Sequence, residues 1–271
     1  MGLRESDIDV LMEYCKNLSV KAGEAIMKVY QNVEELDVAY KEDDSPLTRA
    51  DRISNHIIVE ALKEKYPDFA ILSEEEKDNK ERLDNDYCFI VDPLDGTKEF
   101  IKRNGQFTVN IALAYKHRSI VGVIYAPATG ELYYAASGRG SWLKSRDGVV
   151  RKLQVSSITE HDKIRLVMSS SHPCKEMEEL IEKNHFTNFV EMGSSIKGCL
   201  IAKGEAEIYY RYNPTMEWDT AAMQCIAEEA GAIFRQMDDS EMLYNREDSL
   251  NAKGFYVINH IQNQFHHNER N

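Results

Sequence analysis

Residues 87–97 read YCFIVDPLDGT, an apolar run that ends in a turn with two acidic side chains. The apolar half is short and rich in aromatic and β-branched residues, which predicts a buried β-strand. Within the turn, Pro93 fixes the backbone and Gly96 permits a positive φ angle or a close approach. We therefore expect Asp92 and Asp95 to lie on a rigid turn at the end of a buried strand.

The sequence around this strand predicts two helices followed by a series of strands. Residues 6–30 and 50–65 carry apolar side chains at helical spacing, and Pro67 ends the second helix. Further apolar runs, which predict strands, cover residues 69–72, 107–115, 120–125 and 131–136. Because only short turns separate the last three runs, they predict an antiparallel meander.

The second half of the chain alternates between strands and helices. The expected strands are residues 165–168, 189–191, 207–211 and 255–258, and the expected helices are residues 175–183, 194–203 and 219–230. Residues 138–148 are glycine-rich and polar, which indicates a boundary. We therefore expect an α+β subdomain over residues 1–140 and an α/β subdomain over residues 141–271, packed as layers of helix and sheet.

The composition is that of a globular, acidic protein. Of 271 residues, 42% are hydrophobic and 29% are charged, and the formal net charge is −13. Binding of duplex nucleic acid needs many Lys and Arg side chains, so this charge argues against a polymeric nucleic-acid partner. The sequence shows no signal peptide and no apolar stretch of membrane-spanning length, which predicts a cytoplasmic protein and leaves peripheral association with the inner membrane open. The five cysteines form no CxxC pair, which favours reduced thiols over a zinc site or disulfides.

Three further acidic residues stand where predicted elements begin or end. Glu74 follows a predicted strand, and Asp51 and Asp219 stand near the starts of predicted helices. Each also has an ordinary explanation: a solvated loop for Glu74, a capping box with Thr48 for Asp51, and an N-cap for Asp219. The acidic turn itself is compatible with an Asx-turn. Carboxylates gathered at such positions are nevertheless typical of a Mg²⁺ site, which combines one or two carboxylates per ion with water and substrate phosphate.

The motifs also resemble a known family. The segments LSEE (72–75), VDPLDGTKEF (91–100) and EWDTAA (217–222) resemble the inositol monophosphatase/fructose-1,6-bisphosphatase superfamily of lithium-sensitive phosphatases. Further matches, at residues 45–51, 100–115, 122–127, 169–172 and 193–211, resemble its CysQ-type 3′(2′),5′-bisphosphate nucleotidases. This resemblance implies a layered α-β-α-β-α sandwich. It also implies hydrolysis of adenosine 3′,5′-bisphosphate to AMP and phosphate, and it leaves use of 3′-phosphoadenylyl sulfate open.

The resemblance implies a site with two or three Mg²⁺ ions, held mainly by the first subdomain. The implied metal ligands are Glu74, Asp92, the carbonyl of Leu94, Asp95 and Asp219. Thr97, paired with Glu74 or Asp51, would orient the attacking water. Two ions can lower the pKa of a bound water and neutralise a leaving alkoxide, so no covalent intermediate is needed. In agreement, the sequence contains no GxSxG or P-loop motif.

Substrate recognition is expected mainly from the second subdomain. Ser194 and Lys197 stand three residues apart near a helix start, an arrangement that favours an anion, although without a family context an N-cap serine and a solvated lysine explain them better. The resemblance implies that a larger set contacts the substrate, namely Gly96, Thr97, Lys98, His172, Ser194, Lys197, Arg211 and Asp219. The chain departs from the family pattern at Met223, where glycine is usual, and at Ser73, where inositol monophosphatases usually have glycine.

Two other functions are compatible with the sequence. An inositol monophosphatase or a broader sugar-phosphate phosphatase would use the same metal chemistry, but Lys197 and Arg211 favour a substrate with a second phosphate. A non-catalytic sensor of metal or nucleotide is disfavoured, because every acidic ligand and Thr97 are present. The sequence does not determine the oligomeric state.

Overall fold

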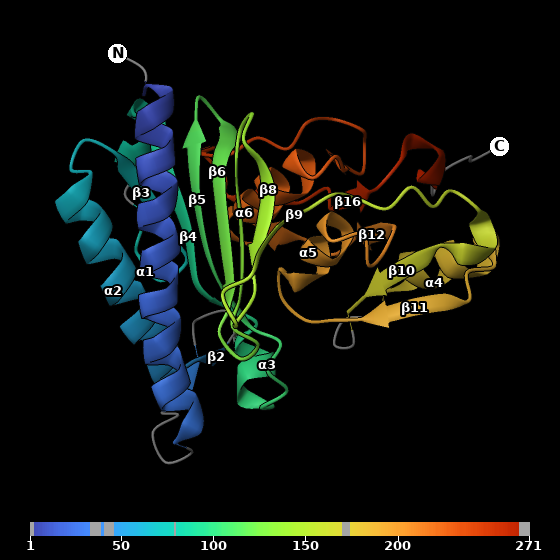
Figure 1. Ribbon diagram of the computed structural model, residues 1–271, viewed down its shortest axis with the longest axis horizontal. Helices are drawn as coiled ribbons and strands as arrows, with labels where there is room; N and C mark the ends of the chain where they lie inside the picture. The colour runs from blue at the N-terminus through green and yellow to red at the C-terminus, as the bar shows by residue number, and fades with distance from the viewer. Residues whose placement is uncertain (1–2, 33–38, 41–45, 79, 170–173, 266–271) are drawn as a thin grey trace.

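The computed structural model describes residues 3–32, 39–40, 46–78, 80–169 and 174–265. These residues form five layers in the order helix, sheet, helix, sheet, helix (Figure 1). A large sheet lies between two pairs of helices, and a smaller sheet with one outer helix follows. The layered sandwich implied by the sequence is therefore confirmed.

The large sheet is built around the strand that carries the acidic turn. Its strands are β3 (Ala70–Ser73), β4 (Tyr87–Asp95), β5 (Thr108–Tyr115), β6 (Arg118–Ala126), β7 (Glu131–Ala136), β8 (Gly140–Lys144) and β9 (Val150–Lys152). They are hydrogen-bonded in chain order; β3 and β4 run parallel, and every later pair is antiparallel. The predicted meander is confirmed.

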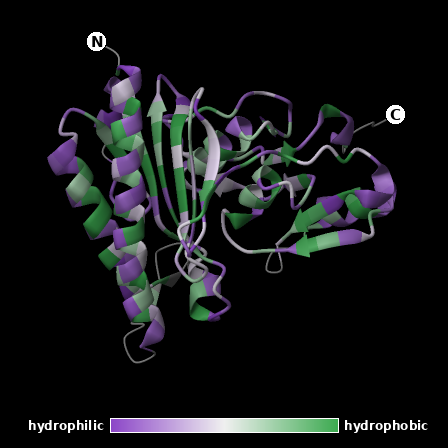
Figure 2. Ribbon diagram, in the orientation of Figure 1, coloured by the Kyte–Doolittle hydropathy of each residue, from purple (hydrophilic) through white to green (hydrophobic). Residues whose placement is uncertain are grey.

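Two amphipathic helices, α1 (Glu5–Gln31) and α2 (Arg49–Lys65), cover the outer face of this sheet. Their buried residues recur every three or four positions, so each helix turns one apolar stripe toward the strands. Figure 2 shows hydrophilic residues interspersed along both helices, whereas β5 and β6 are largely hydrophobic. The Ser54 hydroxyl of α2 donates a hydrogen bond to the Pro93 carbonyl (2.7 Å), which holds the start of α2 against the acidic turn.

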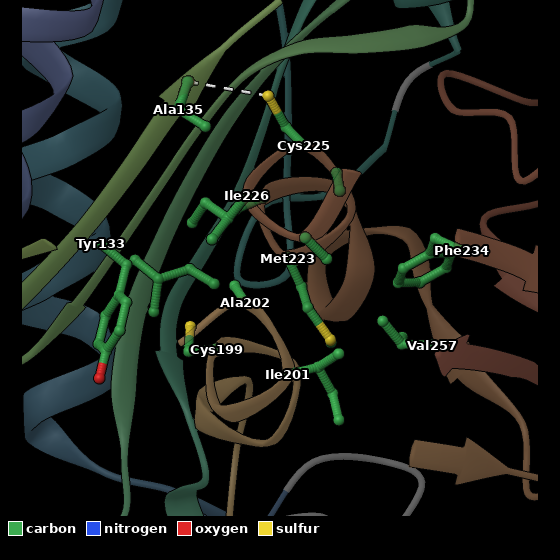
Figure 3. Packing of buried hydrophobic residues seen from close by; sticks show 14 of the residues in the cluster. Tyr133, Ala135, Cys199, Ile201, Ala202, Met223, Cys225, Ile226, Phe234 and Val257 are labelled. Atoms are coloured by element: carbon green, nitrogen blue, oxygen red, sulfur yellow. Dashed lines mark hydrogen bonds between the residues drawn. The ribbon is translucent and has the colours of Figure 1, made fainter. Parts of the chain in front are cut away.

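The inner layer consists of α5 (Ile196–Ala202) and α6 (Glu217–Glu229), which lie between the two sheets (Figure 1). Every residue of α5 is buried, as are nine of the 13 residues of α6. Helices that are buried on nearly all sides suit such a position. One core cluster runs from Leu72 in the large sheet through Ile226 of α6 to Val257 in the smaller sheet, and Figure 3 shows its centre.

The smaller sheet follows the alternating pattern of the second half. Its strands are β10 (Arg165–Met168), β11 (Asn188–Glu191), β12 (Ile208–Arg211), β14 (Ile233–Gln236) and β16 (Phe255–Ile258). Their order is β11-β10-β12-β16-β14; β10 is parallel to both neighbours, and β16 is antiparallel to both of its own. Helix α4 (Lys175–Asn184) packs on this sheet through Met177 and Leu180.

Three strands of the two main sheets were not expected from the sequence. β8 lies within residues 138–148, where the sequence indicates a boundary, β9 follows it in the large sheet, and β14 joins the smaller sheet. Gly138 and Gly140 adopt positive φ angles between β7 and β8. The two glycines therefore belong to a tight hairpin turn. Because hairpin turns and linkers are both rich in glycine, the sequence alone indicates a boundary here. The division into two subdomains at residues 140 and 141 remains a prediction.

The remaining elements are short. They are β1 (Ala39–Tyr40), β2 (Pro46–Leu47), η2 (Glu81–Asp84), α3 (Thr97–Ile101), η3 (His161–Lys163), β13 (Thr215–Met216), β15 (Leu250–Asn251) and η4 (Ile261–Asn263). Within the described ranges, none of the helices combines the length and the hydropathy that crossing a bilayer requires.

Candidate metal centre and phosphate pocket

A bulge at the end of β4 brings the two aspartates of the turn together. Between the paired positions Asp92–Asn110 and Asp95–Thr108, β4 contains one residue more than β5. Pro93 stands in this bulge, where its missing N–H is tolerated. In a regular strand, residues three apart point to opposite faces, but a bulge changes the direction of the side chains that follow it. The bulge therefore allows the carboxylates of Asp92 and Asp95 to lie on the same side of the strand, close to each other.

Asp92, Asp95 and Asp219 form what we call the carboxylate cluster, in which one oxygen of each residue lies within 4.8 Å of the others. Burial, together with the negative charges of Glu74, Asp95 and Asp219, raises the pKa of Asp92 well above its usual value. Burial and then the charge of Asp95 raise the pKa of Asp219 to about 7. Several acidic groups thus crowd into a poorly solvated place, where the ionised forms are unfavourable without a cation.

The donor atoms of this cluster fit Mg²⁺. They are carboxylate oxygens, the hard ligands that this ion prefers. The Leu94 N–H donates to Asp92 Oδ1 (3.1 Å), so the turn folds back around that carboxylate. Asp219 is the third residue of α6, and its Oδ2 accepts the N–H of Met216 (2.6 Å). Met216 is the N-cap residue, so Asp219 is not itself the N-cap, and the first turn of the helix holds its carboxylate.

Asp51 and Thr97 form a second functional group beside the turn. Thr97 Oγ1 donates to Asp51 Oδ1 (3.0 Å), which favours Asp51 as the partner of Thr97. The other oxygen, Oδ2, accepts the Thr48 N–H (2.8 Å), so Asp51 is also part of the predicted capping box. Burial raises the pKa of Asp51, although the hydrogen bonds from Thr48 and Thr97 oppose this effect.

A pocket of about 250 Å³ opens beside the carboxylate cluster. It is lined by nine of the residues that the sequence analysis singles out, namely Glu74, Asp95, Gly96, Thr97, Lys98, Ser194, Lys197, Arg211 and Asp219. Asp51, Asp92 and Leu94 are buried and are not among the residues lining the pocket. His172 lies outside the described residues. Gly96 has a φ of 93°, and a Cβ there would lie 2.9 Å from the carbonyl oxygen of Gln106, so the turn requires glycine.

Two cations line the same pocket. Lys197 is 7% exposed, and burial lowers its pKa to about 8, while the nearby charge of Asp95 opposes the shift. Its ammonium nitrogen lies 5.7 Å from the centre of the Tyr209 ring. The Nε atom of Arg211 is buried and has no hydrogen-bond partner within the part of the chain that the structure describes. A buried ammonium group and a buried guanidinium nitrogen need an anion or another acceptor.

Two residues that support the cluster were not predicted. The backbone N–H of Ser195 donates to Asp95 Oδ2, and its hydroxyl oxygen lies 2.6 Å from the same atom. Asn110 Nδ2 donates to Ser195 Oγ (2.9 Å) and lies 3.4 Å from Asp95 Oδ2. In the sequence, Asn110 could have been recognised as a supporting residue, because it is a polar residue inside a largely apolar strand. Ser195 offered none, because only the fold brings it to residue 95.

A second buried polar group lies next to the first turn of α6. We call it the ion-pair network; its members are Asp78, Arg82, Glu217, Asn245 and Arg246. Glu217 accepts the backbone N–H groups of Asn245 (2.6 Å) and Arg246 (3.0 Å) and an ion pair from Arg246 Nε (3.2 Å). Arg82 donates to Asp78, to Asn245 Oδ1 (2.8 Å) and to the Arg246 carbonyl (2.8 Å). The network therefore joins the segment after β3 to the start of α6.

Several curated proteins similar to this chain share one name. The 3′(2′),5′-bisphosphate nucleotidase CysQ of Salmonella typhimurium is 41% identical over 248 residues, which are 91% of this chain and 99% of that protein. The CysQ nucleotidase of Escherichia coli strain K12 is 40% identical over 249 residues, 92% and 99% of the two chains.

Solved structures give the same result for the fold. CysQ from Bacteroides thetaiotaomicron, 40% identical, superposes with a TM-score of 0.77 over 90% of this chain and 95% of that one. The suhB protein of Bartonella henselae, 25% identical, superposes with a TM-score of 0.80 over 93% and 95%. The family model described as the inositol monophosphatase family matches residues 7–268. The resemblance carried by the motifs is confirmed, and the chain belongs to the inositol monophosphatase family.

Proposed function

We propose that this protein is a Mg²⁺-dependent phosphatase that hydrolyses adenosine 3′,5′-bisphosphate to AMP and phosphate. The observation that carries the proposal is the composition of a single pocket. Asp95 and Asp219 of the carboxylate cluster line it, and so do two cations, the buried Lys197 and the half-buried Arg211. Such a pocket suits a substrate with one phosphate at the metal centre and another held by the protein.

The metal ligands would be the residues that the sequence singles out. These are Glu74, Asp92, the carbonyl of Leu94, Asp95 and Asp219, and two or three ions would share them. Bound Mg²⁺ supplies a water of lowered pKa and neutralises negative charge on the oxygens of the reacting phosphate. The chain itself has to hold these ligands, orient the water and retain the substrate.

Thr97 and Asp51 are suited to orient the attacking water. Because the Thr97 hydroxyl donates its proton to Asp51 Oδ1, a lone pair on Thr97 Oγ1 remains free to accept a hydrogen bond from water in the pocket. The raised pKa of Asp51 makes it a better proton acceptor than an exposed aspartate. Thr97 therefore holds the attacking water, and Asp51 accepts, through the Thr97 hydroxyl, the proton that the water loses during attack.

Substrate choice would depend on Lys197 and Arg211, which hold the phosphate that is not cleaved. Arg211 presents a planar fork that a phosphate can accept in bidentate fashion. Lys98, Ser194 and the backbone at Gly96 line the pocket nearby and would contact the sugar and the reacting phosphate. The substrate contact that the resemblance implies for His172 remains part of the proposal.

A substrate panel tests this function. Purified protein with Mg²⁺ should show a higher kcat/KM for adenosine 3′,5′-bisphosphate than for adenosine 3′-monophosphate or inositol 1-phosphate. Arg211→Ala should lower kcat/KM for the bisphosphate by about one to two decades, because one charge-assisted contact contributes roughly 1.5–3 kcal/mol. The two monophosphates should change little. Arg118→Ala, which removes an exposed arginine paired with Glu241, is the matched control and should leave all three values unchanged.

Three outcomes would contradict the proposal in different ways. A wild-type preference for inositol 1-phosphate would replace the nucleotidase with an inositol monophosphatase. Equal losses for all substrates in Arg211→Ala would mean that this residue acts at the reacting phosphate or in folding. Full turnover in excess chelator would refute the metal-dependent mechanism altogether.

The family resemblance supports three finer proposals. Activity should be inhibited by Li⁺, and replacing Mg²⁺ with Ca²⁺ should lower it, because Ca²⁺ prefers longer bonds and more ligands than an octahedral site offers. The protein should act in the cytoplasm. Fractionation of cells that express it would separate this location from the inner membrane surface.

A further inference from the structure

The Met223 side chain of α6 packs directly against Gly198 of α5. A Cβ built on Gly198 of α5 would overlap both Cγ and Sδ of Met223 on α6 and would lie 3.7 Å from its Cβ. The Met223 side chain therefore fills the space that glycine leaves open at position 198. Figure 3 shows Met223 extending from α6 toward Ile201 of α5. Met223 is also one of the two positions at which the chain departs from the family pattern.

This contact lies between functional residues on both helices. On α6, Met223 stands four residues after Asp219, so the two share one face of the helix. On α5, Gly198 directly follows Lys197. Met223 lines the same pocket as Lys197 and Asp219. A change in the separation of the helices here would move the ammonium group relative to the carboxylate cluster.

The start of α5 is already attached to the cluster. Ser195 donates its backbone N–H to Asp95, and its hydroxyl oxygen lies 3.1 Å from the Asp219 carbonyl oxygen. With that end held, the contact between Gly198 and Met223 determines the tilt of the next turn. Lys197 lies between the attachment and the contact, so its position depends on both.

We propose that Met223 and Gly198 form a positioning pair that sets the place of Lys197 in the pocket. Through Lys197, the pair determines how strongly the enzyme discriminates a substrate with a second phosphate from one without it. This inference rests on the proposed function. Met223 is thus a specificity-determining residue, and it acts by packing and makes no polar contact with the substrate.

Single and double substitutions test the pair. Gly198→Ala adds one methyl group that meets Met223, and alanine is the better helix former, so any loss cannot come from helix propensity. We expect KM for adenosine 3′,5′-bisphosphate to rise about tenfold, as for a lost charge-assisted contact. The kcat for this substrate and the kcat/KM for adenosine 3′-monophosphate should change less than about threefold. In Gly198→Ala/Met223→Ala, where the space is free again, KM should return to within about threefold of wild type.

Met242→Ala is the matched control. Met242 is a buried methionine of the same core cluster and does not line the pocket, so its loss should lower stability without changing the preference for the bisphosphate. Met223→Ala alone should raise KM for the bisphosphate about threefold, and it provides the test if Gly198→Ala does not fold. Failure of the double variant to restore KM, or equal losses for both nucleotides, would overturn the inference. The wild-type ratio of the two kcat/KM values tests the proposed function separately, because it involves neither substitution.

Discussion

The first turn of α6 contacts two buried polar groups that differ in one respect. Asp219 belongs to the carboxylate cluster, and Glu217, two residues earlier, belongs to the ion-pair network. The cluster brings together side chains of one charge, whereas the network alternates carboxylates with Arg82 and Arg246. The same helix turn thus serves one group that lacks a counter-charge and another that contains its own.

The pKa values follow this difference. In the cluster, burial and like charges raise the pKa of Asp92 and Asp219. In the network, hydrogen bonds from Arg82 lower the pKa of Asp78. Burial raises the pKa of Glu217, but hydrogen bonds from Arg246 and Asn245 oppose that shift. Hence a buried group of like charges beside a pocket is suited to bind a cation, whereas a group with balanced charges is suited to stabilise the fold.

The largest expected effect separates the two groups by activity. Asp95→Asn removes a charge from the carboxylate cluster and should lower kcat by at least about a thousandfold (~4 kcal/mol) while the protein stays folded. The isosteric change Asp78→Asn in the ion-pair network should lower kcat less than about threefold. Phosphate release by both variants with saturating Mg²⁺ measures the difference. A folded Asp95→Asn protein with more than a tenth of wild-type kcat would contradict the assignment.

A smaller effect separates the groups by stability. Glu217→Ala leaves Arg246 and two backbone N–H groups without their buried acceptor, which should lower the free energy of unfolding by about 3 kcal/mol. Asp92→Asn relieves repulsion inside the carboxylate cluster and should leave this free energy unchanged or higher. Urea unfolding of the metal-free proteins at pH 8 compares them. If both variants lost stability equally, the distinction between the two groups would fail.

The smallest expected effect, counted per pH unit, is the dependence of stability on pH. The pKa of Asp219 is about 7 in the folded chain, and that of an aspartate in the unfolded chain is about 4. Between these values the folded, metal-free protein keeps a proton that the unfolded chain has released, so stability should fall as pH rises from about 4 to 7. The slope contributed by one group is at most about 1.4 kcal/mol per pH unit.

Asp219→Asn should reduce this slope, as should excess Mg²⁺ added to the wild type. Thermal or urea unfolding across the range, with and without metal, provides the measurement. If the slope of stability against pH were the same in wild type and in Asp219→Asn, the Asp219 carboxylate would not be the cause of the pH dependence.

The sequence predicts the parts of the site that lie in local motifs. Asp92 and Asp95 occur in one turn after a strand, and Thr48 with Asp51 forms a local capping box, so each pair can be identified without a structure. Ser195 cannot, because its partner Asp95 is 100 positions away in the sequence.

The parts that the sequence does not predict depend on tertiary contacts. Arg82 and Asn245 are separated by 163 positions, and nothing local distinguishes either of them from a surface residue. In the fold, β8 was missed because Gly138 and Gly140 serve a hairpin turn. Composition alone does not separate such a turn from a linker.

The position of α6 also bears on how the protein is made. The large sheet is complete in sequence by Lys152, the end of β9, but its inner face is covered by residues that are synthesised much later. Ser119 bonds the carbonyl of Ala221, 102 positions further along the chain, and Gly138 bonds Glu229. A nascent chain therefore leaves the ribosome with apolar strands exposed until α6 has emerged. Such late, long-range closure slows folding and leaves the unfinished chain open to aggregation or chaperone binding.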